Sequence, residues 1–131
     1  MLSMQSSARA FDSSVLILFL NNGLAAAHVQ AMHQALTAGA AHISAIVRAE
    51  VLAWGGHTPA SLAVASDFLD LFLLVPVDAA VANEAARIRR EHGLKLPDAL
   101  FAATALLGNA SLMTANAKDF RRVELLSLIE V

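Results

Sequence analysis

The chain has 131 residues, 57% of them hydrophobic and 15% charged, and nine basic against eleven acidic residues give a formal net charge of −2. The apolar fraction excludes a mainly disordered chain, and the absence of cysteine excludes disulfides, thiolate catalysis and cysteine-based zinc sites. The slight acidity excludes a general polyanion-binding surface but not a local nucleic-acid site. The length predicts a single domain over residues 1–131, and the apolar excess indicates surface covered by a partner.

Short β-prone segments alternate with longer helical segments along the chain. In chain order, the first half is predicted to contain a strand at 9–11, helices at 15–20 and 24–36, a strand at 42–44, and helices at 46–54 and 59–71. The second half is predicted to contain a buried strand at 73–77, helices at 78–93 and 97–107, a strand at 111–114, a turn or short helix at 116–120, and a strand at 126–131. This alternation predicts an α/β fold, a three-layer α/β/α sandwich with a short parallel central sheet.

No predicted segment is suited to a membrane. The apolar run at 15–20 is too short to span a bilayer, and the alanine-rich stretch at 24–41 contains histidines and glutamines. Without a recognisable secretory signal, a cytoplasmic protein is the expectation, with no membrane partner.

Four acidic residues stand where a parallel α/β sheet binds its ligands, or on apolar helix faces. Asp12 and Asp119 follow predicted strands, at the carboxyl ends where ligands bind. Glu50 lies three or four residues from Ile46, Val47, Ala53 and Trp54, so we expect it on a buried face. Asp98 shares a helix face with apolar residues.

Each of these acids also has an ordinary explanation. Asp12 fits a helix cap, Glu50 a salt bridge to a distant arginine, Asp98 a helix start, and Asp119 a turn. If the four converge, their charges repel by about 4 kcal/mol per pair at 4 Å, which a divalent cation would offset. A cation held by carboxylates suits phosphodiester hydrolysis, although the same chemistry serves phosphatases.

Four segments together resemble the ordered motifs of PIN domains. They are Phe-Asp-Ser-Ser-Val-Leu-Ile at 11–17, Ile-Ser-Ala-Ile-Val-Arg-Ala-Glu-Val-Leu at 43–52, Leu-Pro-Asp-Ala-Leu-Phe-Ala-Ala-Thr-Ala at 96–105, and Leu-Met-Thr-Ala-Asn-Ala-Lys-Asp-Phe at 112–120. Their order and the small size of the chain resemble the VapC-type toxins of bacterial toxin–antitoxin pairs. The resemblance implies an endoribonuclease that uses Mg²⁺ or Mn²⁺ to activate water against RNA. It further implies a homodimer inhibited by a cognate antitoxin protein that covers the acidic cleft.

The resemblance also implies roles for individual residues. Asp12, Glu50 and Asp98 match the metal-site acids, and Ser13 and Thr114 match hydroxyl residues beside them. The fourth acid of the family often stands where this chain has Asn116, and Asp119 is then expected to join the catalytic site instead.

Other features are less specific. The chain has four basic candidates for RNA contact: Arg87, Arg90, Lys95 and Lys118. By default they belong to a solvated surface, and contact with the RNA backbone is the minority interpretation. Trp54 is expected in the core or a dimer interface. Two alternatives stay open: a PIN fold that binds without turnover, and a receiver-type signalling domain that binds Mg²⁺.

Overall fold

The central sheet of the protein is entirely parallel. The computed structural model describes residues 8–131, and within them the strands are β1 (Arg9–Phe11), β2 (Ala41–Ser44), β3 (Leu73–Val75), β4 (Ser111–Thr114) and β5 (Leu128–Glu130). They pair in the order β3-β2-β1-β4-β5, each with its neighbour in parallel. β1 is therefore the central strand.

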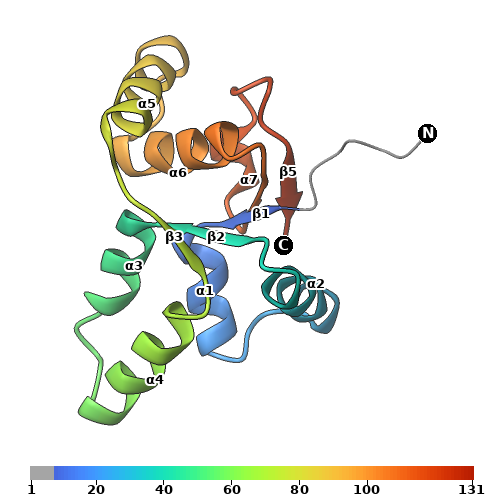
Figure 1. Cartoon of the computed structure of the whole chain (residues 1–131), viewed down its shortest axis with the longest axis vertical. Coiled ribbons are helices and arrows are strands. Elements are labelled where there is room, and N and C mark those ends of the chain that lie inside the picture. Colours follow the sequence, from blue (N-terminus) through green and yellow to red (C-terminus); the bar gives the residue numbers. More distant parts are fainter. Residues whose placement is uncertain (1–7) are drawn as a thin grey trace.

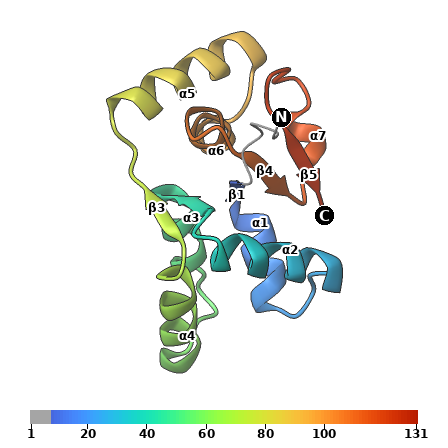
Figure 2. The same ribbon diagram turned by 45° about the vertical axis from the view of Figure 1, so that its right-hand side comes forward.

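Helices cover both faces of the sheet. The helices are α1 (Ser13–Leu20), α2 (Ala26–Thr37), α3 (Ala45–Leu52), α4 (Pro59–Leu69), α5 (Ala79–His92), α6 (Leu96–Leu107) and α7 (Ala117–Phe120). Figure 1 shows α5 and α6 above the sheet and α1, α3 and α4 below it, and the turned view of Figure 2 separates the same two groups. The predicted three-layer α/β/α sandwich is confirmed. Residues 1–7 lie outside the described residues, so a single domain over residues 1–131 stays a prediction.

Local sequence signals account for several helix ends. The Thr58 side chain accepts a hydrogen bond from the Ser61 amide, the Ser61 hydroxyl accepts one from the Thr58 amide, and Pro59 stands in the first turn of α4. At the other end of the fold, α5 stops at Gly93, which adopts a left-handed φ of 72°. These ends match the predicted boundaries because capping depends on residues close in sequence.

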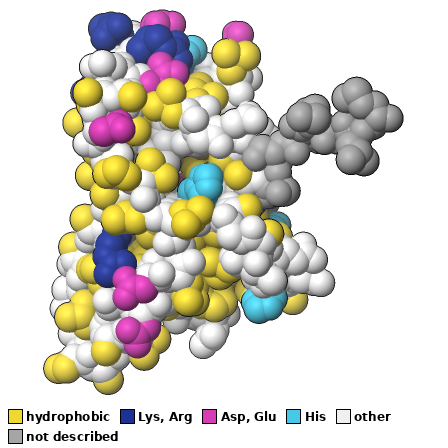
Figure 3. Space-filling view, viewed as in Figure 1, with side chains coloured by type: hydrophobic (Ala, Val, Ile, Leu, Met, Phe, Trp, Pro, Cys, Tyr) yellow, Lys and Arg dark blue, Asp and Glu magenta, His cyan; other side chains and the backbone are white. Residues whose placement is uncertain are grey.

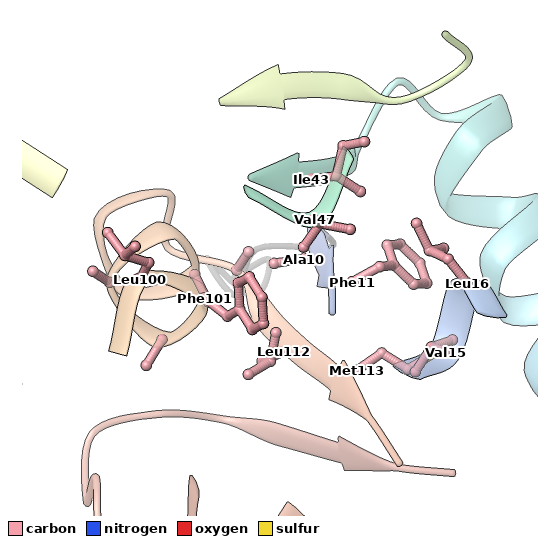
Figure 4. Packing of buried hydrophobic residues seen from close by; sticks show 14 of the residues in the cluster. Ala10, Phe11, Val15, Leu16, Ile43, Val47, Leu100, Phe101, Leu112 and Met113 are labelled. Atoms are coloured by element: carbon pink, nitrogen blue, oxygen red, sulfur yellow. The ribbon is translucent and has the colours of Figure 1, made fainter. Parts of the chain in front are cut away.

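The core lies on both sides of β1. In Figure 4, Phe11 points toward Leu16 of α1, and Ala10 points the opposite way, toward Phe101 of α6. Phe11 is 1% exposed and Ala10 is 2% exposed. Burial on both faces is typical of a central parallel strand. It holds the start of α1 in a fixed place relative to the sheet.

The structure contradicts one expectation about strand burial and excludes the core location for Trp54, whose location in a dimer interface stays a prediction. The segment after α4 was predicted to form a buried strand, but Leu73 and Leu74 of β3 are 51% and 50% exposed. They are exposed because β3 is an edge strand that pairs only with β2. Trp54, expected in the core or an interface, lies beyond the end of α3 with 59% of its side chain exposed in the single chain, so it does not belong to the core. No helix among residues 8–131 has the length and hydrophobicity needed to cross a bilayer.

The chain changes direction across the sheet between β1 and β4. From β1 it proceeds outward through β2 to β3, and later returns to add β4 and β5 on the other side of β1. In the pairing of these two strands Phe11 stands opposite Met113, so the next residues, Asp12 and Thr114, emerge together at the carboxyl edge. In open parallel sheets this position is the usual ligand site.

Candidate active site

Asp12 is buried at the point where β1 passes into α1. Its side chain is 3% exposed, and it caps α1 by accepting a hydrogen bond from the Val15 amide at 3.3 Å on Oδ1. Oδ1 also accepts from the Ser14 hydroxyl at 2.5 Å, and Oδ2 accepts from the Thr114 hydroxyl at 2.5 Å. The ordinary explanation for Asp12, a helix cap, is therefore correct, but the carboxylate makes further contacts that a cap does not require.

The two hydroxyls that contact Asp12 are themselves oriented by the backbone. Ser14 Oγ accepts from the amide of Ala115 at 3.0 Å, and Thr114 Oγ1 accepts from the amide of Asn116 at 2.9 Å. A hydroxyl has one proton, so each directs that proton at the Asp12 carboxylate. Burial raises the pKa of Asp12, and the hydrogen bonds from Ser14 and Thr114 counteract this by favouring the ionised form.

Glu50 lies at the surface, contrary to the expectation that it occupies a buried helix face. The buried side chains of α3 are Val47 and Val51, and the residues after Leu52 are exposed, because the helix ends before its apolar pattern does. Glu50 accepts a hydrogen bond from the Ser13 hydroxyl at 2.7 Å on Oε1. Within the described part of the chain this bond, and not an ion pair to a distant arginine, holds Glu50, so α3 presents it to the start of α1.

The pKa of Asp98 is affected by all three of the other acids. It lies half-buried in the first turn of α6. Burial raises the pKa of its carboxyl above the ordinary 3.8, and the negative charges of Asp119, Asp12 and Glu50 raise it further, while Lys95 opposes them. Asp12, Glu50 and Asp119 therefore each lie within electrostatic range of Asp98, although the four acids come from four separate segments of the chain.

The donor set fits a hard divalent cation. Mg²⁺ and Mn²⁺ prefer carboxylate oxygens, and a cation would relieve the repulsion that raises the pKa of Asp98. Among the described residues, no three acidic or histidine side chains are already gathered closely enough to hold an ion. What residues 8–131 provide is a set of like charges with one member, Asp12, fixed by three hydrogen bonds.

Asn116 and Asp119 occupy different positions in the loop after β4. Both side chains are exposed, and the Asn116 carbonyl accepts a hydrogen bond from the Asp119 amide at 3.0 Å. The side chain of Asn116 does not cap α7, and the charge of Asp119 acts on Asp98. Asp119 therefore contributes a negative charge near Asp98, whereas the amide of Asn116 carries no charge.

The four basic candidates for RNA contact differ in their surroundings. Arg87 forms ion pairs with Glu84 at 2.6 Å and with Glu91 at 3.2 Å, so its charge is largely neutralised. Figure 3 shows acidic and basic side chains side by side over this part of the molecule. Arg90, Lys95 and Lys118 are exposed, and Lys95 is close enough to lower the pKa of Asp98.

An apolar groove lies between α1, α3 and α4. It has a volume of about 490 Å³, and its lining includes Ile17, Val51, Trp54 and Val64. Ile17 comes four residues after Ser13 on α1, and Trp54 comes four residues after Glu50, just beyond the end of α3. Residues four apart on a helix share a face, so Ile17 lies on the same face of α1 as Ser13, the residue that contacts Glu50.

The fold and the acids define a class of protein: a parallel α/β/α domain with an acidic site where the chain changes direction beside the central strand. Residues 10–126 match the model of the PIN domain family. The chain belongs to the PIN domain family, and this membership removes the receiver-type alternative.

Solved structures show the same fold along almost the whole chain. A toxin–antitoxin complex from Klebsiella pneumoniae contains a chain 30% identical to this one, with a TM-score of 0.74 over 95% of this chain and 100% of that one. VapBC2 from Rickettsia felis, solved with a promoter DNA fragment, is 20% identical with a TM-score of 0.81, covering 95% and 98% of the two chains. DNA-bound VapBC from Salmonella typhimurium is 18% identical with the same TM-score, covering 94% and 97%. No curated protein sequence matches the chain significantly.

Proposed function

We propose that this protein is a metal-dependent endoribonuclease, the toxin of a toxin–antitoxin pair, which acts on RNA in the cytoplasm. The observation that carries the proposal is the environment of Asp98, whose carboxyl is influenced by three other acids from separate segments. Such mutual repulsion costs stability, so the arrangement calls for a compensating cation. Membership of the PIN domain family, whose members are generally nucleases, supports the same conclusion.

Asp12, Glu50 and Asp98 are the residues that would hold Mg²⁺ or Mn²⁺, and Asp119 would complete the acidic site. A bound divalent cation lowers the pKa of a water molecule and stabilises negative charge that develops on the phosphate. Ser14 and Thr114 keep the Asp12 carboxylate in one orientation, and Ser13 restrains Glu50. Lys95, beside Asp98, would attract the RNA backbone toward the acids.

The test is cleavage of total RNA by the purified protein with Mg²⁺, with Mn²⁺ and with a chelator. We expect cleavage that requires metal and that falls more than about 100-fold in Asp12→Asn and Asp98→Asn, exceeding the loss typical of a residue outside the ligand shell. Asp78→Asn is the matched control, because Asp78 caps α5 and asparagine caps equally well.

Two outcomes contradict the proposal. Undiminished cleavage by both site variants would remove the assigned residues from the reaction. RNA binding without any cleavage by the wild-type protein would favour the alternative, a PIN fold that binds without turnover.

We further propose that an antitoxin protein covers the acids and the apolar groove, and that the toxin forms a homodimer. The Klebsiella pneumoniae relative was solved in a toxin–antitoxin complex, which supports the first proposal. The half-exposed leucines of β3, Leu73 and Leu74, are consistent with a partner on that edge. Light scattering of the purified toxin tests the dimer, and a strictly monomeric mass would contradict it.

A further inference from the structure

Two consecutive serines at the start of α1 reach opposite sides of the site. Ser13 Oγ donates to Glu50 on α3, while Ser14 Oγ donates to Asp12 and accepts from the amide of Ala115, which follows β4. The two serines therefore connect the first turn of α1 with segments 37 and 101 residues away. Ser13 contacts one acid of the site, Glu50, whereas Ser14 bridges Asp12 and the loop after β4.

The loop that Ser14 contacts is the one that carries Asp119. The Ala115 amide is bound by Ser14, the Asn116 amide by Thr114, and the Asn116 carbonyl in turn accepts from the Asp119 amide. Hydrogen bonds and the intervening backbone of Ala115 and Asn116 thus together connect Asp12 with Asp119. The side chains of Ala115 and Asn116 are exposed, whereas Ala117 and Phe120 of α7 are buried, so hydrogen bonds rather than burial hold the part of the loop that precedes α7.

We infer that Ser14 is a positioning residue that sets the place of Asp119 relative to Asp12. This inference rests on the proposed function of the same site, and it assigns to Ser14 a role that neither the family motifs nor its position in the helix indicated. Ser14 touches neither the phosphate nor the cation in this account. It acts through the loop, because its hydroxyl is the acceptor for the first amide after β4.

The first experiment measures amide hydrogen exchange by NMR and does not depend on activity. In Ser14→Ala the Ala115 amide should exchange about fivefold faster, since a typical hydrogen bond contributes about that factor. Ser14→Thr, which restores a hydroxyl, should restore the protection. The matched control Ser13→Ala removes a hydroxyl from the same turn and should leave Ala115 unchanged. Unchanged exchange in Ser14→Ala would overturn the inference.

The second experiment is a double-mutant cycle between Ser14→Ala and Asp119→Asn, read out as kcat, KM and Mn²⁺ affinity. We expect Ser14→Ala to lower kcat about tenfold with KM little changed, and to have less than about a twofold effect in the Asp119→Asn background. Equal losses in both backgrounds, or an Asp119→Asn protein as active as wild type, would overturn the inference.

The two experiments also separate this inference from the proposed function. If the wild-type protein cleaves no RNA, the proposed function fails, whereas the exchange of Ala115 and the Mn²⁺ cycle still judge the role of Ser14. Coupling in Mn²⁺ affinity, together with faster Ala115 exchange in Ser14→Ala, would then support positioning, and additive affinities would reject it.

Discussion

At Asp98, burial and three neighbouring negative charges act in the same direction on one carboxyl. Each raises its pKa above 3.8, so the folded protein binds this proton more tightly than the unfolded chain does. Stability therefore falls as the pH rises through the interval between the unfolded and folded pKa values. In the absence of a cation, the ionised Asp98 weakens the fold at neutral pH.

The first prediction concerns Asp98→Asn in chelator. The variant should be more stable than wild type at pH 7, because it lacks the unfavourable charge, and the difference should shrink as the pH falls toward 3.8. Urea unfolding between pH 4 and pH 8 measures this difference. A variant that is less stable at pH 7, or a difference that does not depend on pH, would contradict it.

The second prediction concerns Thr114, whose hydroxyl is buried against Asp12. Thr114→Val keeps the shape of the side chain but leaves Oδ2 of a buried carboxylate without its donor and the Asn116 amide without its acceptor, so the unfolding free energy should fall by about 1.5–3 kcal/mol. Thr104→Val is the matched control, because the Thr104 hydroxyl is equally buried but donates to the Leu100 carbonyl within α6. Equal losses in the two variants would show that the contact with Asp12 has no special weight.

At the scale of elements, an apolar groove lies between α1, α3 and α4. Val64 lines it and is 62% exposed, so this side chain contributes little to the core. The third prediction is that Val64→Glu weakens binding of the co-expressed antitoxin by about 10- to 100-fold, since a partner would have to bury the charge. Calorimetry measures the affinity, and RNA cleavage by the toxin alone should not change.

Leu125→Glu is the control for this prediction. Leu125 is 87% exposed and does not line the groove. Antitoxin binding should therefore survive this substitution. If Leu125→Glu weakens the complex as much as Val64→Glu does, added charge alone explains the effect and the groove is not the docking surface.

An element was predicted correctly where the residues that determine it are close together in the sequence. Helix starts at Asp12 and Thr58 and the stop at Gly93 follow from residues next to one another, and the sequence predicted them. The exposure of Leu73 and of Glu50 depends on strand order and on where α3 ends, and sequence reasoning predicted both wrongly. The role of Ser14 depends on a contact 101 residues away, which no local pattern reveals.

At the scale of the whole molecule, a net charge of −2 coexists with a site proposed for a polyanion. The two lysines of the chain, Lys95 and Lys118, are exposed, while Arg87 forms ion pairs with two glutamates. The acidity of the chain is thus partly concentrated at the proposed cation site. We expect local contacts, and not overall charge, to hold RNA.

The fourth prediction follows for RNA binding in chelator. In Lys95→Ala and in Lys118→Ala, the slope of log affinity against log salt should become shallower by about 0.7, the value for one phosphate contact with a single strand. Arg87→Ala should leave the slope nearly unchanged because its charge is already paired. Fluorescence anisotropy at several salt concentrations measures the slopes. A larger change for Arg87 than for either lysine would contradict this assignment.

The central claim is that Asp12, Glu50, Asp98 and Asp119 form one cation site, and Mn²⁺ binding measured by calorimetry or electron paramagnetic resonance tests it most directly. We predict that wild type and Asp78→Asn bind Mn²⁺ alike, and that Asp98→Asn binds it more than about tenfold more weakly. An Asp98→Asn protein that binds Mn²⁺ as tightly as wild type would contradict the account.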